Sequence, residues 1–207
     1  MIDIDRTLYT IGHSKHTQQF FLKLLKLNKI NCIVDVRSTP FSKFSPQFNK
    51  DELKKFLNKY GVYYIHMGVE FGARREEKNL YTKEGYLDFE KTAESKQFLN
   101  GVERISKGIE KNFRIAFMCT EKDPIDCHRN ILVAKQFYKR NYDIQNILEN
   151  GYLESQEHLE KRLLDMYFPN RYQLDFMDLI KKSKTEEELI DEAYKLRNKD
   201  IGYTLNE

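Results

Sequence analysis

The sequence has few cysteines, and their spacing does not match common disulfide or metal motifs. Three cysteines in 207 residues is a small and odd number, which argues against a structural disulfide framework. No two of them have the C-x-x-C spacing of thioredoxin-type redox motifs and zinc knuckles. We therefore expect a reduced, cytoplasmic protein.

Long apolar runs and a secretory leader are also missing. No apolar stretch approaches the roughly 18 residues that a membrane-spanning helix needs. The first residues, Met1 to Arg6, include aspartates where a signal peptide would have a basic start and an apolar run. Internal repeats and low-complexity segments are missing as well. We expect no membrane partner.

Neither sign of charge dominates the chain. Lysine and arginine number 35 against 32 aspartates and glutamates, which gives a formal net charge of +3, and the two signs are interspersed. This balance does not by itself predict nucleic-acid binding. With 40% hydrophobic and 32% charged residues, the chain is predicted to be globular and long enough for a real core.

The first 150 residues alternate between strand and helix patterns. Short apolar or β-prone runs fall at 8–11, 32–36, 62–66, 114–118 and 144–148. Between them, apolar residues recur with a helical period in segments that start near Thr17, Asn49, Gly85 and Cys127. The helix at Asn49 should begin with a capping box to Glu52. This alternation predicts an α/β fold with a mostly parallel sheet of about five strands, flanked by helices in Rossmann-like layers.

After residue 150 the pattern becomes helical. Ser155 is expected to cap one helix, and Thr185 with Glu188 forms a capping box for another. We therefore predict an α/β domain over residues 1–150 that carries the functional site. A helical C-terminal extension over residues 151–207 is expected to pack on it.

Polar and ionisable residues follow the predicted strands where each strand ends. In an open parallel sheet, ligands bind outside the carboxyl ends of the strands, because loops and helix N-termini converge there. A single histidine at such a place is more often just hydrogen-bonded to backbone, but the whole set favours a site. The set consists of Gly12, His13, Ser14, Asp35, Arg37, His66, Gly72, Arg74, Cys119 and Glu121.

The segment AFMCTEKDPIDCHRN, residues 116–130, holds two of the cysteines. Asp126 is expected to be the N-cap of the following helix, which places Cys127, His128 and Arg129 in its first turn. Free backbone N–H groups and the helix dipole favour a thiolate and an anion there. Cys119, at the strand end, is expected to face this helix start.

Three functional interpretations of these residues remain open. An enzyme would use a thiol, an imidazole and a carboxylate to act on an anionic small molecule that arginines hold. Its catalytic candidates are His13, Asp35, Cys119, Glu121, Cys127 and His128, and its substrate-binding candidates are Gly12, Ser14, Arg37, Gly72, Arg74 and Arg129. A mononuclear metal site would use Cys119, Cys127 and one of His13, His66 or His128. Core packing of the cysteines, with a salt bridge from Arg129 to Asp35 or Glu121, is the purely structural alternative.

After the enzyme and the metal site, the third functional interpretation is a binding module for a nucleotide or a nucleic acid. Basic residues alternate with aromatics in RSTPFSKFSPQF, from Arg37 to Phe48, as in loops that stack bases and contact phosphates. The simpler alternative buries Phe41, Phe44 and Phe48 in the core. Cys32 lies in an apolar strand and is expected to be an inert core residue.

Five ordered motifs resemble a known family. They are YTIGHS, IVDVRSTPFSKFSPQFNKDEL, FGARR, GYLDF and MCTEKDPIDCHRN, and they span about residues 7 to 150. In this order they are similar to the signatures of the bacterial and archaeal proteins catalogued as domain of unknown function 488. The resemblance implies a shared polar site made of the candidates above, but it implies no substrate. Ala73 replaces the second glycine of the family's usual Gly-Gly-Arg motif.

Overall fold

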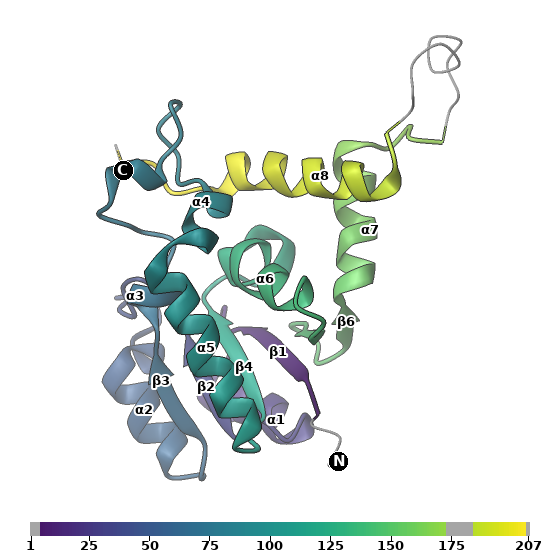
Figure 1. Ribbon diagram of the computed structural model, residues 1–207. Helices are drawn as coiled ribbons and strands as arrows, with labels where there is room; N and C mark the ends of the chain where they lie inside the picture. The colour runs from purple at the N-terminus through teal and green to yellow at the C-terminus, as the bar shows by residue number, and fades with distance from the viewer. Residues whose placement is uncertain (1–4, 173–183, 206–207) are drawn as a thin grey trace.

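A six-stranded sheet lies at the centre of the computed structural model, which describes residues 5–172 and 184–205 (Figure 1). In spatial order its strands are β3 (Tyr63–His66), β2 (Cys32–Asp35), β4 (Ile115–Cys119), β1 (Thr7–Gly12), β5 (Asp143–Ile147) and β6 (Leu153–Ser155). The first five are parallel, and β6 is antiparallel to β5. The predicted α/β fold with a mostly parallel sheet is therefore confirmed.

Helices cover both faces of this sheet. They are α1 (Gln18–Leu27), α2 (Lys50–Asn58), α3 (Gly68–Phe71), α4 (Phe89–Glu94), α5 (Lys96–Glu110), α6 (Lys135–Tyr138), α7 (Gln156–Tyr167) and α8 (Glu186–Ile201). Short 3-10 turns occupy η1 (Pro46–Phe48), η2 (Lys78–Leu80) and η3 (Pro124–Asp126), and η4 (Arg129–Ala134) is a π-helix.

The central strands are buried on both sides, and their residues alternate between two cores. In β4, Phe117 and Cys119 belong to the core formed with α5 and η4, whereas Ala116 and Met118 belong to the core formed with α1 and α2. Successive side chains of a strand point to opposite faces, so this division follows from the period of two. Cys119 thus points to the same side of the sheet as η4.

Side-chain caps begin several helices as the sequence predicts. The side chains of Thr17, Ser155 and Thr185 accept backbone N–H bonds at the starts of α1, α7 and α8, and Thr185 forms the full capping box with Glu188. The capping box predicted at Asn49 is wrong. Its Oδ1 accepts the N–H of Ser42 at 2.7 Å instead, because the preceding loop folds back on the helix start.

Other elements differ from the predicted pattern. The helix expected from Gly85 is divided at Ser95, whose side chain caps α5. The helix expected from Cys127 to Arg140 consists of η4 and α6. Strand β6 was not predicted: Gly151, at φ 87°, turns the chain back so that Tyr152 and β6 pair beside β5. The domain division at residue 150 stays a prediction, although this pairing crosses it.

The last helix lies across the top of the molecule, from α7 toward α4 (Figure 1). Asn198, which is buried, accepts the Phe89 N–H at 2.9 Å and donates to the Leu87 carbonyl at 2.8 Å. Arg197 donates to the carbonyl of Ile125, next to the cysteine-rich segment, at 3.0 Å. Within residues 5–172 and 184–205, no helix has the length and apolar character that crossing a membrane requires.

Replacement of Asn198 by alanine should destabilise the protein. The change leaves a buried N–H and a buried carbonyl unpaired, which costs about 1–3 kcal/mol of unfolding free energy. Urea denaturation followed by circular dichroism measures this, with the exposed neighbour Lys199→Ala as the control, for which we expect a change within about 0.5 kcal/mol. Equal stabilities of the two variants would show that α8 is held by other contacts.

Candidate functional site

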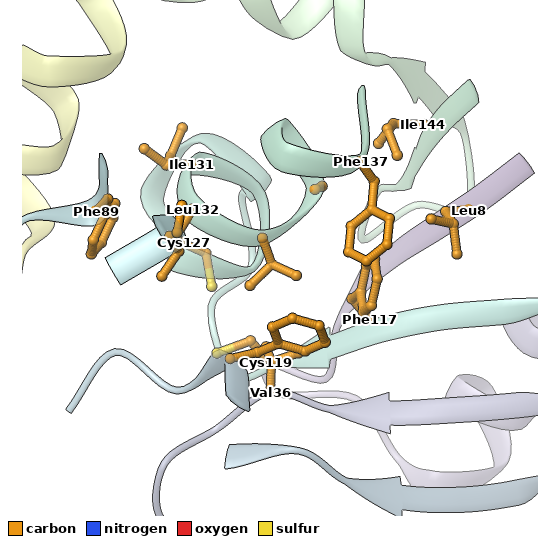
Figure 2. Close-up of a cluster of buried hydrophobic side chains, with 14 of the residues drawn as sticks. Leu8, Val36, Phe89, Phe117, Cys119, Cys127, Ile131, Leu132, Phe137 and Ile144 are labelled. Carbon is orange, nitrogen blue, oxygen red and sulfur yellow. The ribbon is translucent and has the colours of Figure 1, made fainter. Parts of the chain in front are cut away.

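Two cysteines and a histidine come together where β4 ends and the following helical segment begins. The Cys119 Sγ lies 3.9 Å from the His128 Nδ1, and the Cys127 Sγ lies 4.0 Å from the same nitrogen. The three atoms all lie within 4.8 Å of one another. Figure 2 shows the sulfur of Cys127 pointing toward Cys119 within a buried cluster. We call these three residues the Cys–Cys–His cluster.

Cys127 itself occupies the N-terminal capping position, so the prediction that Asp126 is the N-cap is wrong. Cys127 is extended, with φ −135° and ψ 135°, and its carbonyl accepts the N–H of Ile131. Its Sγ accepts the N–H of Arg129 at 3.5 Å, as a capping side chain does. The carboxylate of Asp126 instead binds the guanidinium of Arg197, because α8 lies against this turn.

The orientation of His128 is fixed by a backbone carbonyl. Its Nε2 lies 3.1 Å from the oxygen of Val36, the residue after β2. A carbonyl oxygen only accepts hydrogen bonds, so the Nε2 carries the proton and donates. The Nδ1 is therefore the nitrogen that faces the two sulfurs.

The two thiols of the cluster have opposite tendencies to ionise. Burial raises the pKa of Cys127, but the Cys119 thiol, the Arg129 charge and His128 outweigh it and hold this pKa well below its usual range. The hydrogen bond with Cys127, together with burial, raises the pKa of Cys119. Burial lowers the pKa of His128, yet the net shift is upward because Cys127 lies beside it. Ionisation is therefore favoured at Cys127 and His128 and disfavoured at Cys119.

Arg129 is fully buried beneath the cluster. Its guanidinium donates to the backbone carbonyls of Glu121 at 2.7 Å and Lys122 at 3.3 Å, and not to the carboxylate of Asp35 or Glu121 that the structural alternative required. Its Nε has no partner within the described part of the chain. A buried cation without a counterion is costly, and the charge of Arg129 favours the thiolate form of the nearby Cys127.

The loops after β1 and β4 are joined directly. The N–H groups of His13 and Ser14 donate to the carbonyls of Cys119 and Thr120, each at 2.9 Å. Gly12 makes this approach possible, because a Cβ there would lie 1.9 Å from the Glu121 carbonyl oxygen. Ser14 adopts the left-handed conformation with φ 38°, which few non-glycine residues tolerate. Gly12 and Ser14 thus shape the backbone beside the cluster.

Asp35 and Arg37 form a buried ion pair next to the cluster. The Arg37 Nε and Nη2 donate to the two Asp35 oxygens at 2.9 and 2.6 Å. Tyr64 donates a further bond to Asp35 at 2.6 Å, and Arg37 donates to the Phe48 carbonyl at 2.8 Å. The donors of Arg37 are thereby held by Asp35 and Phe48, although Arg37 also lines the cleft beside the cluster.

His13 belongs to the same buried network. Its Nε2 accepts a bond from the Arg37 Nη1 at 3.1 Å, and its ring stacks on Phe48 with a centroid distance of 4.4 Å. Burial and the charge of Arg37 lower its pKa to about 4. His13 is therefore neutral near pH 7, with its lone pair already used.

A cleft of about 510 Å³ opens onto the Cys–Cys–His cluster. Arg74 is exposed in its wall and lies over the ring of Tyr203, 4.9 Å from its centroid. Glu121 also lines the cleft, and its pKa is raised by partial burial and by Cys127. The wall formed by residues 200–203, at the C-terminal end of α8, was missed by sequence reasoning, because no local pattern links that segment to strand ends so far back in the chain.

The other candidates lie away from the three ligand atoms. His66 binds the Arg37 carbonyl at 2.8 Å and lines a neighbouring cleft. Gly72 is needed for packing, because a Cβ would lie 2.3 Å from the Gly68 oxygen. Ala73 does not have a positive φ, so the family's second glycine is not needed there. Cys32 is buried in β2, and burial raises its pKa to about 12.

The loop between Arg37 and Phe48 is only partly packed. Phe48 is fully buried, as the simpler alternative predicts. Phe44 is 99% exposed and Phe41 is 62% exposed, so that alternative is wrong for these two residues. Phe41 also lines the cleft, which places an aromatic side chain at its mouth.

Stability should fall on acidification because of His13. The lowered pKa means that the folded state disfavours the protonated ring, so the His13 contribution is intact above pH 6.5 and is lost as the pH falls toward 4. The loss should reach about 3 kcal/mol, and His13→Gln should make the decline between these pH values shallower. Urea denaturation at several pH values measures this. The exposed His158→Gln is the control, and a His13→Gln variant with the wild-type slope would contradict the assignment.

The comparisons with known proteins agree with the five motifs of the sequence. Residues 17–135 match the family described as Domain of unknown function DUF488, and this stretch includes the whole Cys–Cys–His cluster. The motif at residues 9–14 precedes the matched stretch. Comparisons with curated proteins and with solved structures give no match. Because the matched residues make up more than half of the 207-residue chain, the protein belongs to the DUF488 family.

Proposed function

We propose that the protein is an enzyme that acts on a small anionic substrate at the Cys–Cys–His cluster. The observation that carries this proposal is the approach of two cysteines and a histidine at the end of β4, where they line a cleft that also contains the exposed guanidinium of Arg74. The pKa of Cys127 is lowered there, which favours its thiolate form. A thiolate is the form of cysteine that reacts and that binds metal ions. Stabilising one inside a protein requires the specific positive charges found here, and such perturbed groups gather at functional sites.

Each lining residue has a role in this proposal. Cys127 supplies the electron-rich atom, and His128 holds a proton within reach of it. Glu121, with its raised pKa at the mouth of the cleft, exchanges protons with the substrate. Arg74 binds the anionic group. Arg37 acts as a positioning residue, because its donors hold Asp35, His13 and the Phe48 carbonyl.

The chemistry of the cluster favours a reducing compartment. The two sulfurs lie within 4.8 Å of each other, and all three cysteines are free. An oxidising compartment would convert Cys119 and Cys127 to a disulfide and remove the thiolate. This supports our proposal of a cytoplasmic location.

Alkylation tests the thiolate without a known substrate. In protein treated with a chelator, iodoacetamide near pH 7 should label Cys127 at least about tenfold faster than Cys119, because the pKa of Cys127 is lowered and that of Cys119 is raised. Cys32 should remain unlabelled until the protein unfolds. Mass spectrometry of a timed reaction gives the three rates. Equal and slow labelling of all three cysteines would indicate that they are ordinary core residues, and it would contradict the proposal.

The same assay tests the anionic substrate. Inorganic phosphate or pyrophosphate should slow the labelling of Cys127 by occupying the cleft. Arg74→Gln should abolish this protection, whereas Arg104→Gln should keep it, because Arg104 pairs with Glu70 outside the cleft. Protection that persists in Arg74→Gln would show that another residue binds the anion.

A second candidate function is the binding of single-stranded nucleic acid. It is favoured by the exposure of Phe41 and Phe44 on either side of the exposed Lys43. Of these residues, Phe41 lines the cleft that contains Arg74. Exposed aromatic rings stack on bases, and interspersed cations contact phosphates. In this function the protein is a binding module without turnover.

Fluorescence anisotropy with a labelled oligothymidylate tests this second function. Phe41→Leu and Phe44→Leu should each weaken binding by about five- to a hundredfold, since one stacked base contributes about 1–3 kcal/mol. Binding should also weaken as salt is added. Tyr152→Leu, which removes an exposed ring elsewhere, is the matched control. Binding that ignores both salt and the two phenylalanines would count against the stacking loop.

A further inference from the structure

The Cys–Cys–His cluster has the composition and spacing of a mononuclear metal centre. We infer that Cys119, Cys127 and His128 bind one zinc-type divalent ion, and that the fourth coordination position faces the cleft. Two thiolates and one imidazole are soft ligands that select zinc over harder cations such as magnesium. The role of the metal centre rests on the proposed function, whereas the presence of the ion follows from the geometry of its ligands.

The ligand atoms are close to the spacing that a tetrahedral ion requires. Zinc–sulfur bonds of ~2.3 Å and zinc–nitrogen bonds of ~2.0–2.1 Å place sulfur and nitrogen ligands ~3.6 Å apart. The sulfurs of Cys119 and Cys127 lie 3.9 and 4.0 Å from the His128 Nδ1. A contraction of a few tenths of an ångström, which small side-chain rotations supply, would bring all three atoms onto one ion.

Hydrogen bonds already hold two of the ligands in the orientation that a metal needs. His128 donates its Nε2 proton to the Val36 carbonyl, so the Nδ1 lone pair points at the position between the sulfurs. A ligating histidine almost always has such a partner on its second nitrogen. The N–H of Arg129 donates to the Cys127 Sγ and would stabilise the negative charge of a ligating thiolate.

The cluster offers three ligands rather than four. Among the described residues, no other cysteine, histidine or carboxylate joins the group within 4.8 Å. His13 and His66, the other histidines considered, are held by the Arg37 side chain and the Arg37 carbonyl. Structural zinc sites are closed by four protein ligands, whereas catalytic sites keep one position for water or substrate. Three ligands that line a cleft therefore indicate a catalytic type of centre.

Charge indicates what occupies the fourth position. A divalent ion neutralises two thiolates, so the buried guanidinium of Arg129 beneath them keeps its positive charge. An anion at the fourth position restores neutrality, and Arg74 in the wall of the cleft adds attraction. We therefore expect a hydroxide, or an oxygen of the anionic substrate, at that position.

Titration of the full-length, chelator-treated protein with Co²⁺ tests the site, because cobalt replaces zinc and absorbs light. We expect one equivalent to bind and to produce a thiolate-to-cobalt charge-transfer band together with the intense visible bands of four-coordination. Zn²⁺ should displace the cobalt and remove these bands. Cys119→Ser, Cys127→Ser and His128→Ala should each weaken binding at least about a hundredfold, since loss of an outer-shell partner alone costs 10–100-fold. Cys32→Ser, the remaining cysteine, should bind like the wild type.

A titration without a charge-transfer band would overturn the inference, and so would a band lost in Cys32→Ser but kept in Cys127→Ser. Circular dichroism shows which variants are folded. If the cluster variants do not fold, the wild-type protein still decides, because Zn²⁺ should protect Cys119 and Cys127 from iodoacetamide and a chelator should restore labelling. Unchanged labelling with Zn²⁺ would refute the site. Cobalt binding without phosphate protection of Cys127 would instead leave the metal centre intact and refute the anionic substrate.

Discussion

The burial of one positive charge, that of Arg129, sets the conditions for the rest of the site. Its guanidinium is fully buried and, among the described residues, donates to the backbone carbonyls of Glu121 and Lys122. Its charge helps to lower the pKa of Cys127. The attraction works in both directions: the guanidinium favours the thiolate form of Cys127, and negative charge on that sulfur offsets the cost of burying the guanidinium. Gly12 is part of the same constraint, because only a residue without a Cβ lets the Glu121 carbonyl come close enough to accept from Arg129.

Two polar networks with different tasks meet at this edge of the sheet. In one, Asp35, Arg37 and His13 satisfy each other internally, which fixes the loops after β1 and β2. In the other, the sulfur and nitrogen atoms of the Cys–Cys–His cluster can still bind a ligand from the cleft. A network whose hydrogen bonds are all made internally is rigid, whereas groups that still have free positions can bind a ligand. A reactive centre needs the rigid network to hold its binding groups in place. Val36 connects them, since it follows Asp35 in the chain and its carbonyl orients His128.

The sequence predicted the architecture better than the roles of individual residues. Continuous apolar runs identified the parallel strands, and parallel topology placed their polar ends at one edge, including the approach of Cys119 to the next helix. The hydrogen-bond and ion-pair partners of these polar groups could not be predicted, because they depend on contacts between distant segments of the chain. Asp126 shows the reason: it has the right type and position for an N-cap, yet Arg197 of α8 captures its carboxylate. The three-residue β6 gives too short a pattern to detect.

The π-helix that follows the cluster, η4, is anchored in the interior by directional bonds as well as by packing. Asn130, its second residue, donates to Asn146 of β5 at 2.8 Å and exchanges two bonds of 2.9 Å with Gln156 of α7. Gln156 donates in turn to Tyr194 of α8 at 2.7 Å. Apolar contacts alone would allow this segment to slide, since they have no preferred direction, whereas buried amide pairs fix its position. The residues after 150, which lie beyond the matched part of the chain, therefore hold the element that begins beside Cys127 and His128.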